Sequence, residues 1–395
     1  MRINHVAQEP TLSPAPAFKA SFVTLSKRNL GEEIAVNVVD KFNKSILPKI
    51  KSTQIQEAEE IIRNSRPGKV IQKAKDFQEN VNFFTLAAGS GSRFRELAQT
   101  VGNFNKISLP FKVDSNTDIH MLDFALAMGK YFIQDGGVKK IVASQPSGSF
   151  GDIVQHYLSG NPVKDTVVCC GDNVFGDNAS SMMEFMTSMI NNPQKHVALV
   201  GVARKPEEVA NRFGVLVAKG DLNGETLSLH GFDEKPPLEV AKTLTVNGKN
   251  IANTGLFYVS KEAMEKLLDE IKHGTNNIKK NENEPYDFAL AVKYIHSRLH
   301  DWFGIAPSEG ADVKVVKQWE DVGEPAALYS FADEVKKGSF IANFPKELAQ
   351  KIKAAFSNRV HLDAEHPHIL FTDSTKVSAE KITDAKKVEG VHIVV

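Results

Sequence analysis

Two hydrophobic patterns divide the chain. In residues 30–81, apolar side chains recur every fourth position at Ile34, Val38, Phe42 and Ile46, which predicts helices with one buried face. We expect Pro48 to interrupt this stripe, because proline lacks the backbone N–H that a helix needs. In residues 82–335, short β-type runs alternate with helical ones. Such alternation predicts an α/β domain whose mostly parallel sheet is covered by helices on both faces.

The predicted strands and helices follow one another in regular order. The strands are residues 81–88, 138–144, 165–171 and 195–203, and the helices are residues 121–134, 149–158 and 179–190. In a parallel sheet, ligands bind at the carboxyl ends of the strands. We therefore expect the loops that follow residues 81–88 and 165–170 to open onto one rim.

The two ends of the chain have different patterns. The first thirty residues carry scattered Pro, Ser and Ala without an apolar signal segment, which predicts a disordered tail over residues 1–30. Residues 31–81 form a helical N-terminal extension in this interpretation. Residues 336–395 form a small C-terminal extension, with a helix over 345–356 and then short strands whose spacing hints at a β-helix coil.

Composition narrows the choice of function. Lys+Arg and Asp+Glu both number 48, so no basic excess points to nucleic acid. No apolar run is long enough for a transmembrane helix. The chain has 2 cysteines, the adjacent Cys169 and Cys170, which are expected to be strand residues in the core rather than a disulfide framework. These features fit a cytoplasmic protein without a membrane partner.

The run from Phe83 to Phe94 ends a predicted strand in a glycine-rich turn. Gly89 and Gly91 allow backbone N–H groups to approach an anion, and Arg93 adds a permanently charged donor suited to phosphate. The loop lacks the Gly-Lys-Ser/Thr of a Walker A motif and the third glycine of a dinucleotide fingerprint. A glycine turn after a strand is about as often a simple tight connection, so the loop alone decides nothing.

Five further segments carry polar residues at strand ends or in turns. They contain Lys106 before Leu-Pro, Asp172 in Gly-Asp-Asn, Glu234 and Lys235 before Pro-Pro, Asn253 in a small polar turn, and Asp321 in Trp-Glu-Asp-Val-Gly. Taken singly, each is more often structural than functional. A lysine is usually solvated, an adjacent Glu–Lys pair contributes little, and an Asp after a strand often caps a helix.

In this order, the six segments resemble the motifs of the sugar-1-phosphate nucleotidylyltransferases. The resemblance covers residues 82–335, which would be the nucleotidyltransferase domain. It implies a Rossmann-like sheet of the nucleotide-diphospho-sugar transferase type. It also implies that a sugar-1-phosphate attacks the α-phosphorus of a nucleoside triphosphate (NTP), which releases pyrophosphate and forms a nucleotide sugar.

The resemblance also implies a role for each matching residue. Arg93, Lys106 and Asp172 would be catalytic, and Asp172 and Asp321 would hold Mg²⁺. The nucleotide-binding residues would be Ala88, Gly89, Ser90, Gly91, Ser92, Arg93, Gln145 and Gly171. The sugar-phosphate-binding residues would be Gly214, Glu234, Lys235, Asn253 and Lys280.

Substrate choice and two alternatives stay open at this point. The amide of Gln145 can pair with the imide edge of uracil or thymine, which favours UTP or dTTP. Glucose-1-phosphate is the preferred sugar phosphate, since it is the commonest in the family. The alternatives are a cytidylyltransferase of the isoprenoid or sugar-acid type and a non-catalytic regulatory subunit with the same fold. A homo-oligomer is compatible with each reading.

Overall fold

The computed structural model describes most of the region from residue 38 to residue 371. The described residues are 38–64, 70–87, 107, 110–114, 117–132, 148–176, 179–222, 226–275, 278–279, 286–323, 325–362 and 369–371. The glycine-rich loop after residue 87 and the predicted strand at 138–144 lie outside them.

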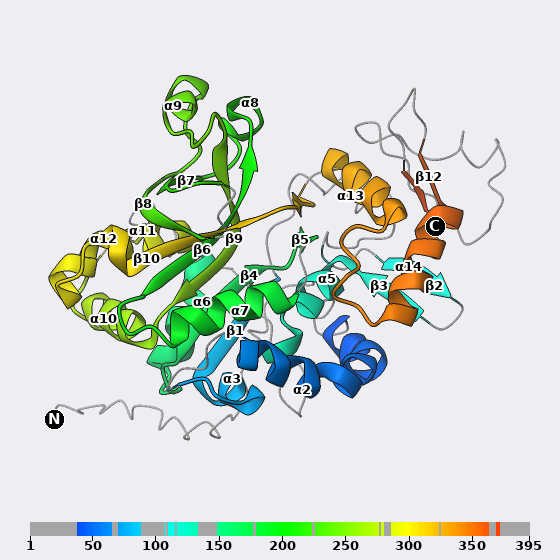
Figure 1. The fold of residues 1–395 in the computed structure, drawn as a ribbon, viewed down its shortest axis with the longest axis horizontal. Helices are drawn as coiled ribbons and strands as arrows, with labels where there is room; N and C mark the ends of the chain where they lie inside the picture. Colours follow the sequence, from blue (N-terminus) through cyan, green and yellow to red (C-terminus); the bar gives the residue numbers. More distant parts are fainter. Residues whose placement is uncertain are drawn as a thin grey trace, which may run out of the picture.

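A seven-stranded mixed sheet forms the centre of the molecule (Figure 1). Its spatial order is β1 (Val81–Leu86), β4 (Asp165–Cys170), β9 (Asn250–Val259), β6 (Val197–Arg204), β10 (Ala311–Val316), β8 (Thr226–Asp233) and β7 (Val215–Lys219). β1 is parallel to β4 and β6 is parallel to β10, whereas β8 and β9 run antiparallel to their neighbours. The α/β class and the strands predicted at residues 81–88, 165–171 and 195–203 are confirmed. The prediction of a mostly parallel sheet is wrong: two of the pairings described in this sheet are parallel and five are antiparallel, because β9 and β8 run against their neighbours.

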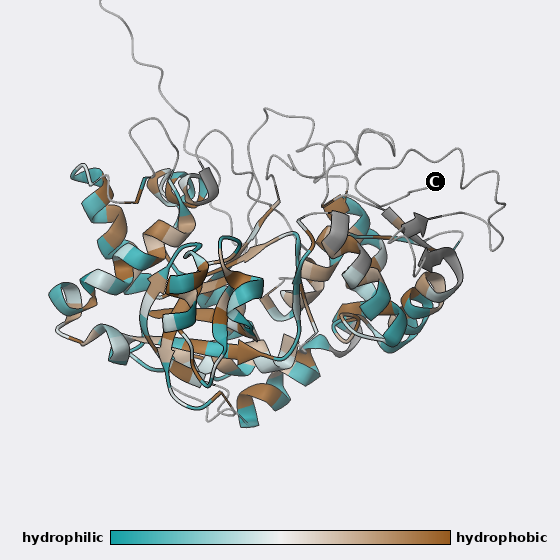
Figure 2. Cartoon of the chain, turned by 90° about the horizontal axis from the view of Figure 1, so that it is seen from above, coloured by the Kyte–Doolittle hydropathy of each residue, from teal (hydrophilic) through white to brown (hydrophobic). Residues whose placement is uncertain are grey.

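Alternating residues of β1 and β4 enter two separate hydrophobic cores. Phe83 and Val167 belong to one core, and Phe84 and Val168 to the other. Successive residues of a strand point to opposite faces, so strands that are apolar throughout must be covered on both sides. The helices supply that cover, and their apolar and polar residues alternate accordingly (Figure 2).

Each face of the sheet has its own helices. One core contains residues of α6 (Gly148–Leu158), α10 (Lys261–Lys272) and α11 (Phe288–Phe303). The other contains residues of α2 (Leu47–Asn64), α3 (Ala74–Asn80), α5 (Met121–Met128), α7 (Ala179–Ile190), α13 (Pro325–Lys337) and α14 (Lys346–Arg359). The helices predicted at 149–158 and 179–190 are confirmed, and so is the C-terminal helix predicted at 345–356.

The N-terminal helices differ from the prediction at Pro48. A π-helical segment, η1 (Phe42–Ile46), runs directly into α2, so the helix continues through the proline. The Leu47 N–H donates to the Phe42 carbonyl, a five-residue step that changes the hydrogen-bond pattern just before the residue without an N–H. Phe77 of α3 then packs edge-to-face on Phe132, with ring centroids 5.4 Å apart. The extension therefore shares the hydrophobic core of the main sheet.

Short elements complete the described chain. The 3₁₀ segment η4 (Lys130–Phe132) follows α5, and the small helices are α8 (Pro206–Val209), α9 (Leu238–Thr243) and α12 (Pro307–Gly310). Paired short strands are β2 (Pro110–Asp114) with β3 (Thr117–His120), β5 (Asn173–Phe175) with β11 (Trp319–Asp321), and β12 (Val360–Leu362) with β13 (Ile369–Phe371).

The C-terminal helices α13 and α14 lie near β2 and β3, far from β7 at the edge of the sheet (Figure 1). Phe111 of β2 contacts Phe356 of α14, with ring centroids 5.0 Å apart. The predicted β-helix coil falls after residue 371, outside the described chain. None of the described helices combines the length and the apolar character needed to cross a membrane. The boundaries of the four predicted segments stay predictions.

Candidate active site

The two predicted metal-binding aspartates lie on adjacent chain segments. β5 and β11 form a small antiparallel pair in which Asp321 lies opposite Asn173. The Val322 N–H donates to the Asp172 carbonyl oxygen at 3.0 Å. Both aspartates are partly buried. Although they are distant in sequence, Asp172 and Asp321 thus meet where β4 ends.

Contacts on both sides hold β11 in place. The guanidinium of Arg204, the last residue of β6, donates to the Trp319 carbonyl oxygen at 2.8 Å. The Gly176 N–H donates to the Gln318 carbonyl oxygen at 3.0 Å. The Trp319 indole packs edge-on against Phe213, with ring centroids 5.2 Å apart. The strand that carries Asp321 therefore has little freedom to move away from Asp172.

Gly171 joins this pair to the start of the glycine-rich loop. Its N–H donates to the carbonyl oxygen of Leu86, the last residue of β1, at 2.8 Å. A Cβ at position 171 would lie 3.0 Å from that oxygen and 3.1 Å from Leu122 Cδ1. Glycine is therefore the residue that lets the two strand ends approach. β1 therefore ends directly beside the Gly171–Asp172 segment.

Three of the predicted sugar-phosphate residues form a second group. The Asn253 N–H donates to the Gly214 carbonyl oxygen at 2.8 Å. A Cβ at Gly214 would lie 2.9 Å from Glu234 Oε2 and 2.6 Å from the Phe232 ring. The Glu234 carboxylate therefore rests directly against the bare backbone of Gly214. A small ligand could contact the carboxylate and that backbone together.

Lys235 has a strained backbone. Its φ is 50°, in the left-handed region that costs a non-glycine residue about 1–2 kcal/mol. Its Nζ lies 3.8 Å from Glu234 Oε1, and its side chain is 58% exposed, so this ion pair does not fix the lysine. Strain of this kind is concentrated at binding and catalytic sites.

The segment Asn253-Thr254-Gly255 links the two groups. It was predicted as a turn, but it lies inside the continuous strand β9, where Gly255 has φ 74° and the pairing with β6 shifts register. The Asn173 side-chain amide donates to the Thr254 carbonyl oxygen. A Cβ at Gly255 would lie 2.8 Å from that amide nitrogen. A glycine bulge, rather than the predicted turn, therefore brings β9 against the Gly-Asp-Asn segment.

The predicted site is therefore partly assembled. The structure places Gly171 and Asp172 beside Asp321, and Gly214 and Asn253 beside Glu234 and its neighbour Lys235. The remaining predicted residues lie outside the described chain: Ala88, Gly89, Ser90, Gly91, Ser92, Arg93, Lys106, Gln145 and Lys280. The roles assigned to all of these residues stay predictions.

Sequence reasoning missed two residues that shape the site. Arg204 anchors β11, and the side chain of Asn173 ties the Gly-Asp-Asn segment to β9. Arg204 directly follows the strand predicted at 195–203, so its place at a carboxyl end was a usable signal. The partner of Asn173 could not be inferred, because it depends on the bulge at Gly255.

The charges at the rim fit a hard divalent cation. Asp172 and Asp321 offer oxygen ligands, and in the described part of the chain no group of three or more His, Cys, Asp or Glu side chains forms a closed metal site. Two carboxylates with open positions suit Mg²⁺, which keeps water and substrate phosphates as its other ligands. Burial, together with the nearby Asp172 charge, raises the pKa of the Cys169 thiol. Cys169 is therefore a neutral core residue, as predicted.

Comparisons with known proteins identify the family. The model of the family described as Nucleotidyl transferase matches residues 126–338. A search of curated proteins gives no match. Among solved structures, UDP-glucose pyrophosphorylase complexed with UDP-glucose is similar with 16% identity and a TM-score of 0.44, covering 70% of this chain and 98% of that one.

Two further solved structures are similar at the same level. A putative glucose-1-phosphate thymidylyltransferase from Bacillus anthracis has 17% identity and a TM-score of 0.41, with 63% of this chain and 92% of that chain covered. The inositol-1-phosphate CTP transferase from T. maritima has 14% identity and a TM-score of 0.40, with 69% and 95% covered. The family match spans more than half of the 395 residues. The chain belongs to the nucleotidyl transferase family and is a nucleotidyltransferase.

Proposed function

We propose that this protein transfers a nucleoside monophosphate from an NTP to a sugar-1-phosphate in a Mg²⁺-dependent reaction that releases pyrophosphate. The observation that carries the proposal is the backbone contact between Asp172 and the segment of Asp321, 3.0 Å from carbonyl oxygen to Val322 nitrogen. Val322 directly follows Asp321, so this contact brings the chain segments of the two aspartates together, and a bound cation would offset their like charges.

The metal side of the site has a defined task. Bound Mg²⁺ would neutralise phosphate charge and polarise the phosphorus–oxygen bonds. Asp172 and Asp321 would hold the cation at the end of β4, and Arg204 would position Asp321 through its bond to Trp319. Gly171 lets the glycine-rich loop begin within reach of the same point. In this arrangement the protein's own part would be to position the cation and to supply the carboxylate charges that hold it.

The sugar side of the site has a different task. Glu234 would accept hydrogen bonds from sugar hydroxyls, and the bare backbone of Gly214 lies against that carboxylate, so a sugar could contact both. Lys235 would donate to the phosphate of the sugar-1-phosphate. The contacts between Asn173 and Thr254 and between Asn253 and Gly214 connect this group to the metal side. Together they would hold the attacking phosphate oxygen in line with the α-phosphorus.

We propose glucose-1-phosphate as the sugar phosphate and UTP or dTTP as the nucleotide. The support is the resemblance of the motifs and the position of Gln145 in the sequence. An amide offers one donor and one acceptor to a pyrimidine imide. This choice is finer than the family assignment and needs its own test.

A pyrophosphate-release assay with UTP, dTTP, CTP, ATP and GTP against a panel of sugar-1-phosphates tests the proposal. We expect turnover that requires both substrates and Mg²⁺ and is highest with glucose-1-phosphate and UTP or dTTP. EDTA should abolish it, and added Mg²⁺ should restore it. Turnover only with CTP and a non-sugar acceptor would favour the cytidylyltransferase alternative. No turnover with any pair would overturn the proposal.

A further inference from the structure

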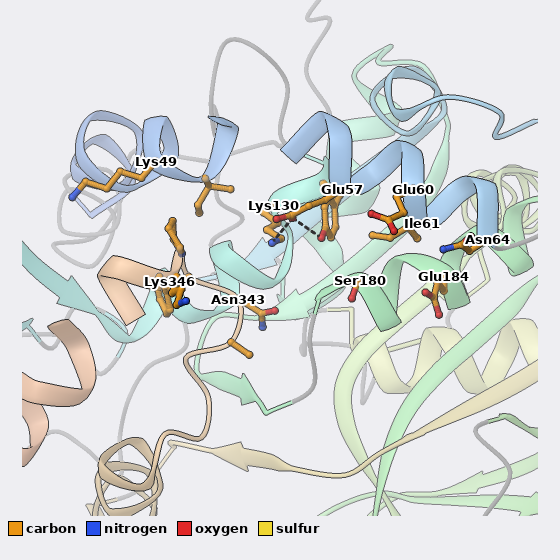
Figure 3. A pocket seen from close by; sticks show the side chains of 15 residues that line it. Lys49, Glu57, Glu60, Ile61, Asn64, Lys130, Ser180, Glu184, Asn343 and Lys346 are labelled. Atoms are coloured by element: carbon orange, nitrogen blue, oxygen red, sulfur yellow. Dashed lines mark hydrogen bonds and ion pairs between the residues drawn. The ribbon is translucent and has the colours of Figure 1, made fainter. Parts of the chain in front are cut away.

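The connection between α13 and α14, residues 338–345, reaches back to the start of α7. Asn343 in this connection is 3% exposed, and its Oδ1 accepts from the Ala179 N–H at 2.6 Å. Figure 3 shows Asn343 beside the cavity that Ser180 of α7 also lines. The two bonded residues are 164 positions apart, and the family match ends at residue 338. The first turn of α7 is therefore capped by a segment that begins where the family match ends.

The backbone of this connection is directed toward α7. Gly338 has φ 104° and Phe340 has φ 64°, so two left-handed residues in close succession reverse the chain after α13. Phenylalanine is disfavoured in this region, because its Cβ crowds the following carbonyl oxygen. The ring of Phe340 is nevertheless buried and stacks on Phe331 of α13, with centroids 5.9 Å apart. Phe344 packs edge-on against Phe124 of α5 at 5.1 Å. Aromatic packing thus maintains a strained path that brings the connection to α7.

The small ribbon at the rim needs anchors outside its own ladder. β5 and β11 have 3 residues each and form a two-stranded sheet. A ribbon this short is at best marginally stable by itself. Asp172 precedes β5 and Asp321 ends β11, so repulsion between the two carboxylates acts across the ribbon when no cation is bound. The geometry of the metal-binding pair therefore depends on what holds the ends of both strands.

The connection supplies such an anchor. β11 leads into α13, and β5 leads into α7. Asn343 follows α13 and bonds Ala179, the first residue of α7. Contacts therefore run in a closed circuit from Asp321 through α13 to α7 and back through β5 to Asp172. Removing the Asn343 cap opens this circuit at the point where α7 begins.

We propose that Asn343 is a positioning residue for Asp172 and Asp321. Its cap on α7 fixes β5 against β11 and so sets how closely the two carboxylates can approach one cation. This role presupposes the proposed Mg²⁺-dependent function. Groups that hold metal ligands in place contribute about 10–100-fold to metal affinity. Because Asn343 acts through α7 and β5, its removal should weaken metal binding and leave the reaction at saturating metal largely unchanged.

Binding of Mn²⁺ to the full chain, measured from the electron paramagnetic resonance signal of the free ion, tests this role without turnover. Asn343→Ala leaves the Ala179 N–H without its acceptor and should weaken Mn²⁺ binding by about tenfold. Asn343→Asp keeps an oxygen at the same place, and a helix start favours a negative charge, so this variant should bind Mn²⁺ within about twofold of wild type. If Asn343→Ala does not fold, Asn343→Ser, whose side chain is shorter, takes its place with the same expected direction.

Ser260→Ala is the matched control, because it removes a buried helix cap far from the rim. Ser260 is 3% exposed, and its hydroxyl oxygen caps α10. It follows β9 at the end where Val259 pairs with Thr166, near the start of β4 and thus opposite Asp172. Ser260→Ala should lower the melting temperature about as much as Asn343→Ala but bind Mn²⁺ like wild type. Equal loss of Mn²⁺ affinity in both variants would indicate a general loss of stability and overturn the positioning role.

Kinetics separate the positioning role from the proposed function. Asn343→Ala should raise the Mg²⁺ concentration for half-maximal turnover by about tenfold, while kcat at saturating Mg²⁺ stays near that of wild type. A lower kcat with an unchanged Mg²⁺ requirement would overturn the positioning role, and so would wild-type Mn²⁺ affinity in Asn343→Ala. Either result leaves the function intact if wild type requires Mg²⁺ and Asp172→Asn loses Mn²⁺ binding. A wild type that binds no Mn²⁺ would instead overturn the metal-binding pair and both proposals with it.

Discussion

The catalytic rim and the N-terminal helices pack around the same sheet, but different forces hold them. At the rim, backbone hydrogen bonds such as Val322 to Asp172 and Asn253 to Gly214 set the geometry, and charged side chains are left at the surface. In the N-terminal extension, apolar burial dominates, and Phe42 and Phe77 are fully buried. The rim thus positions charged groups, whereas the extension stabilises the fold. Substitutions should separate these two roles.

The largest expected effect is on activity at the rim. Asp172→Asn keeps the side-chain shape but removes the negative charge, so turnover with Mg²⁺ should fall by about a thousandfold, as expected when several kcal/mol of metal-dependent stabilisation are lost. Its melting temperature should stay close to that of wild type. Pyrophosphate release across a Mg²⁺ series measures the effect, with Asp269→Asn on α10 as the control. An unchanged rate with normal Mg²⁺ dependence would remove Asp172 from the site.

The matching effect in the extension is on stability. Phe77→Ala opens a cavity beside Phe132 and should lower the free energy of unfolding by about 3–5 kcal/mol. Urea unfolding measures this loss. The kcat of the folded fraction should be unchanged, since the ring is remote from the charges at the rim. A loss of kcat without a loss of stability would show that the extension takes part in catalysis.

The partly buried carboxyl of Asp165, at the amino end of β4, is expected to make stability depend on pH. Burial raises the pKa of Asp165 from 3.8 to about 6. The native state then holds a proton that the unfolded chain releases, so the stability present below pH 3.8 is lost as pH rises through about 6. The linked loss is at most about 3 kcal/mol.

Asp165→Asn should remove this segment of the pH profile. Asparagine can still accept from the Tyr258 hydroxyl and the Lys261 N–H, which both use Oδ1. Unfolding free energies from pH 4 to 8 should therefore fall in wild type and stay flatter in the variant. Activity at the opposite end of the sheet should be unaffected. Parallel profiles would show that Asp165 is ionised throughout this range.

Local patterns predicted much of the fold, because they are written in consecutive residues. The helix at Ala179–Ile190 follows from its helical spacing, and the strands β1 and β4 follow from short, continuous β-type runs. The errors arose where the outcome depends on neighbours. Pro48 is accommodated by a π-turn within a packed helix. Asn253 lies in strand β9, because the bulge at Gly255 lets that strand keep pairing with β6 after a shift of register. Within the site, sequence order suggested which residues belong together but not the anchoring by Arg204.

A smaller effect is expected from crowding the sugar side. Gly214→Ala would place a methyl group 2.6 Å from the Phe232 ring and 2.9 Å from Glu234, which displaces that carboxylate. Overpacking lowers the free energy of unfolding by about 1–3 kcal/mol. Because the displaced carboxylate would lose its contact with the sugar, the KM for sugar-1-phosphate should rise by about tenfold, the value of one charge-assisted contact. Gly231→Ala on the adjacent β8 is the control, because its added methyl group would meet Val217 at an ordinary 3.7 Å. Equal behaviour of the two variants would argue against a tight ligand contact at Gly214.

The smallest effect tests whether strain and charge at Lys235 are separate. Lys235→Ala and Lys235→Gly both remove the ammonium group, so each should raise the KM for sugar-1-phosphate by about tenfold, the value of one charge-assisted contact. Only glycine adopts the φ of 50° without cost, so the glycine variant should be more stable than the alanine variant by about 1 kcal/mol. Kinetics and urea unfolding of the pair measure both quantities. If both variants lose binding equally but the alanine variant is less stable than the glycine variant, the backbone at position 235 keeps its left-handed conformation, and the strain belongs to the position that holds the charge. If the two variants are equally stable, the backbone at position 235 relaxes when the lysine is removed.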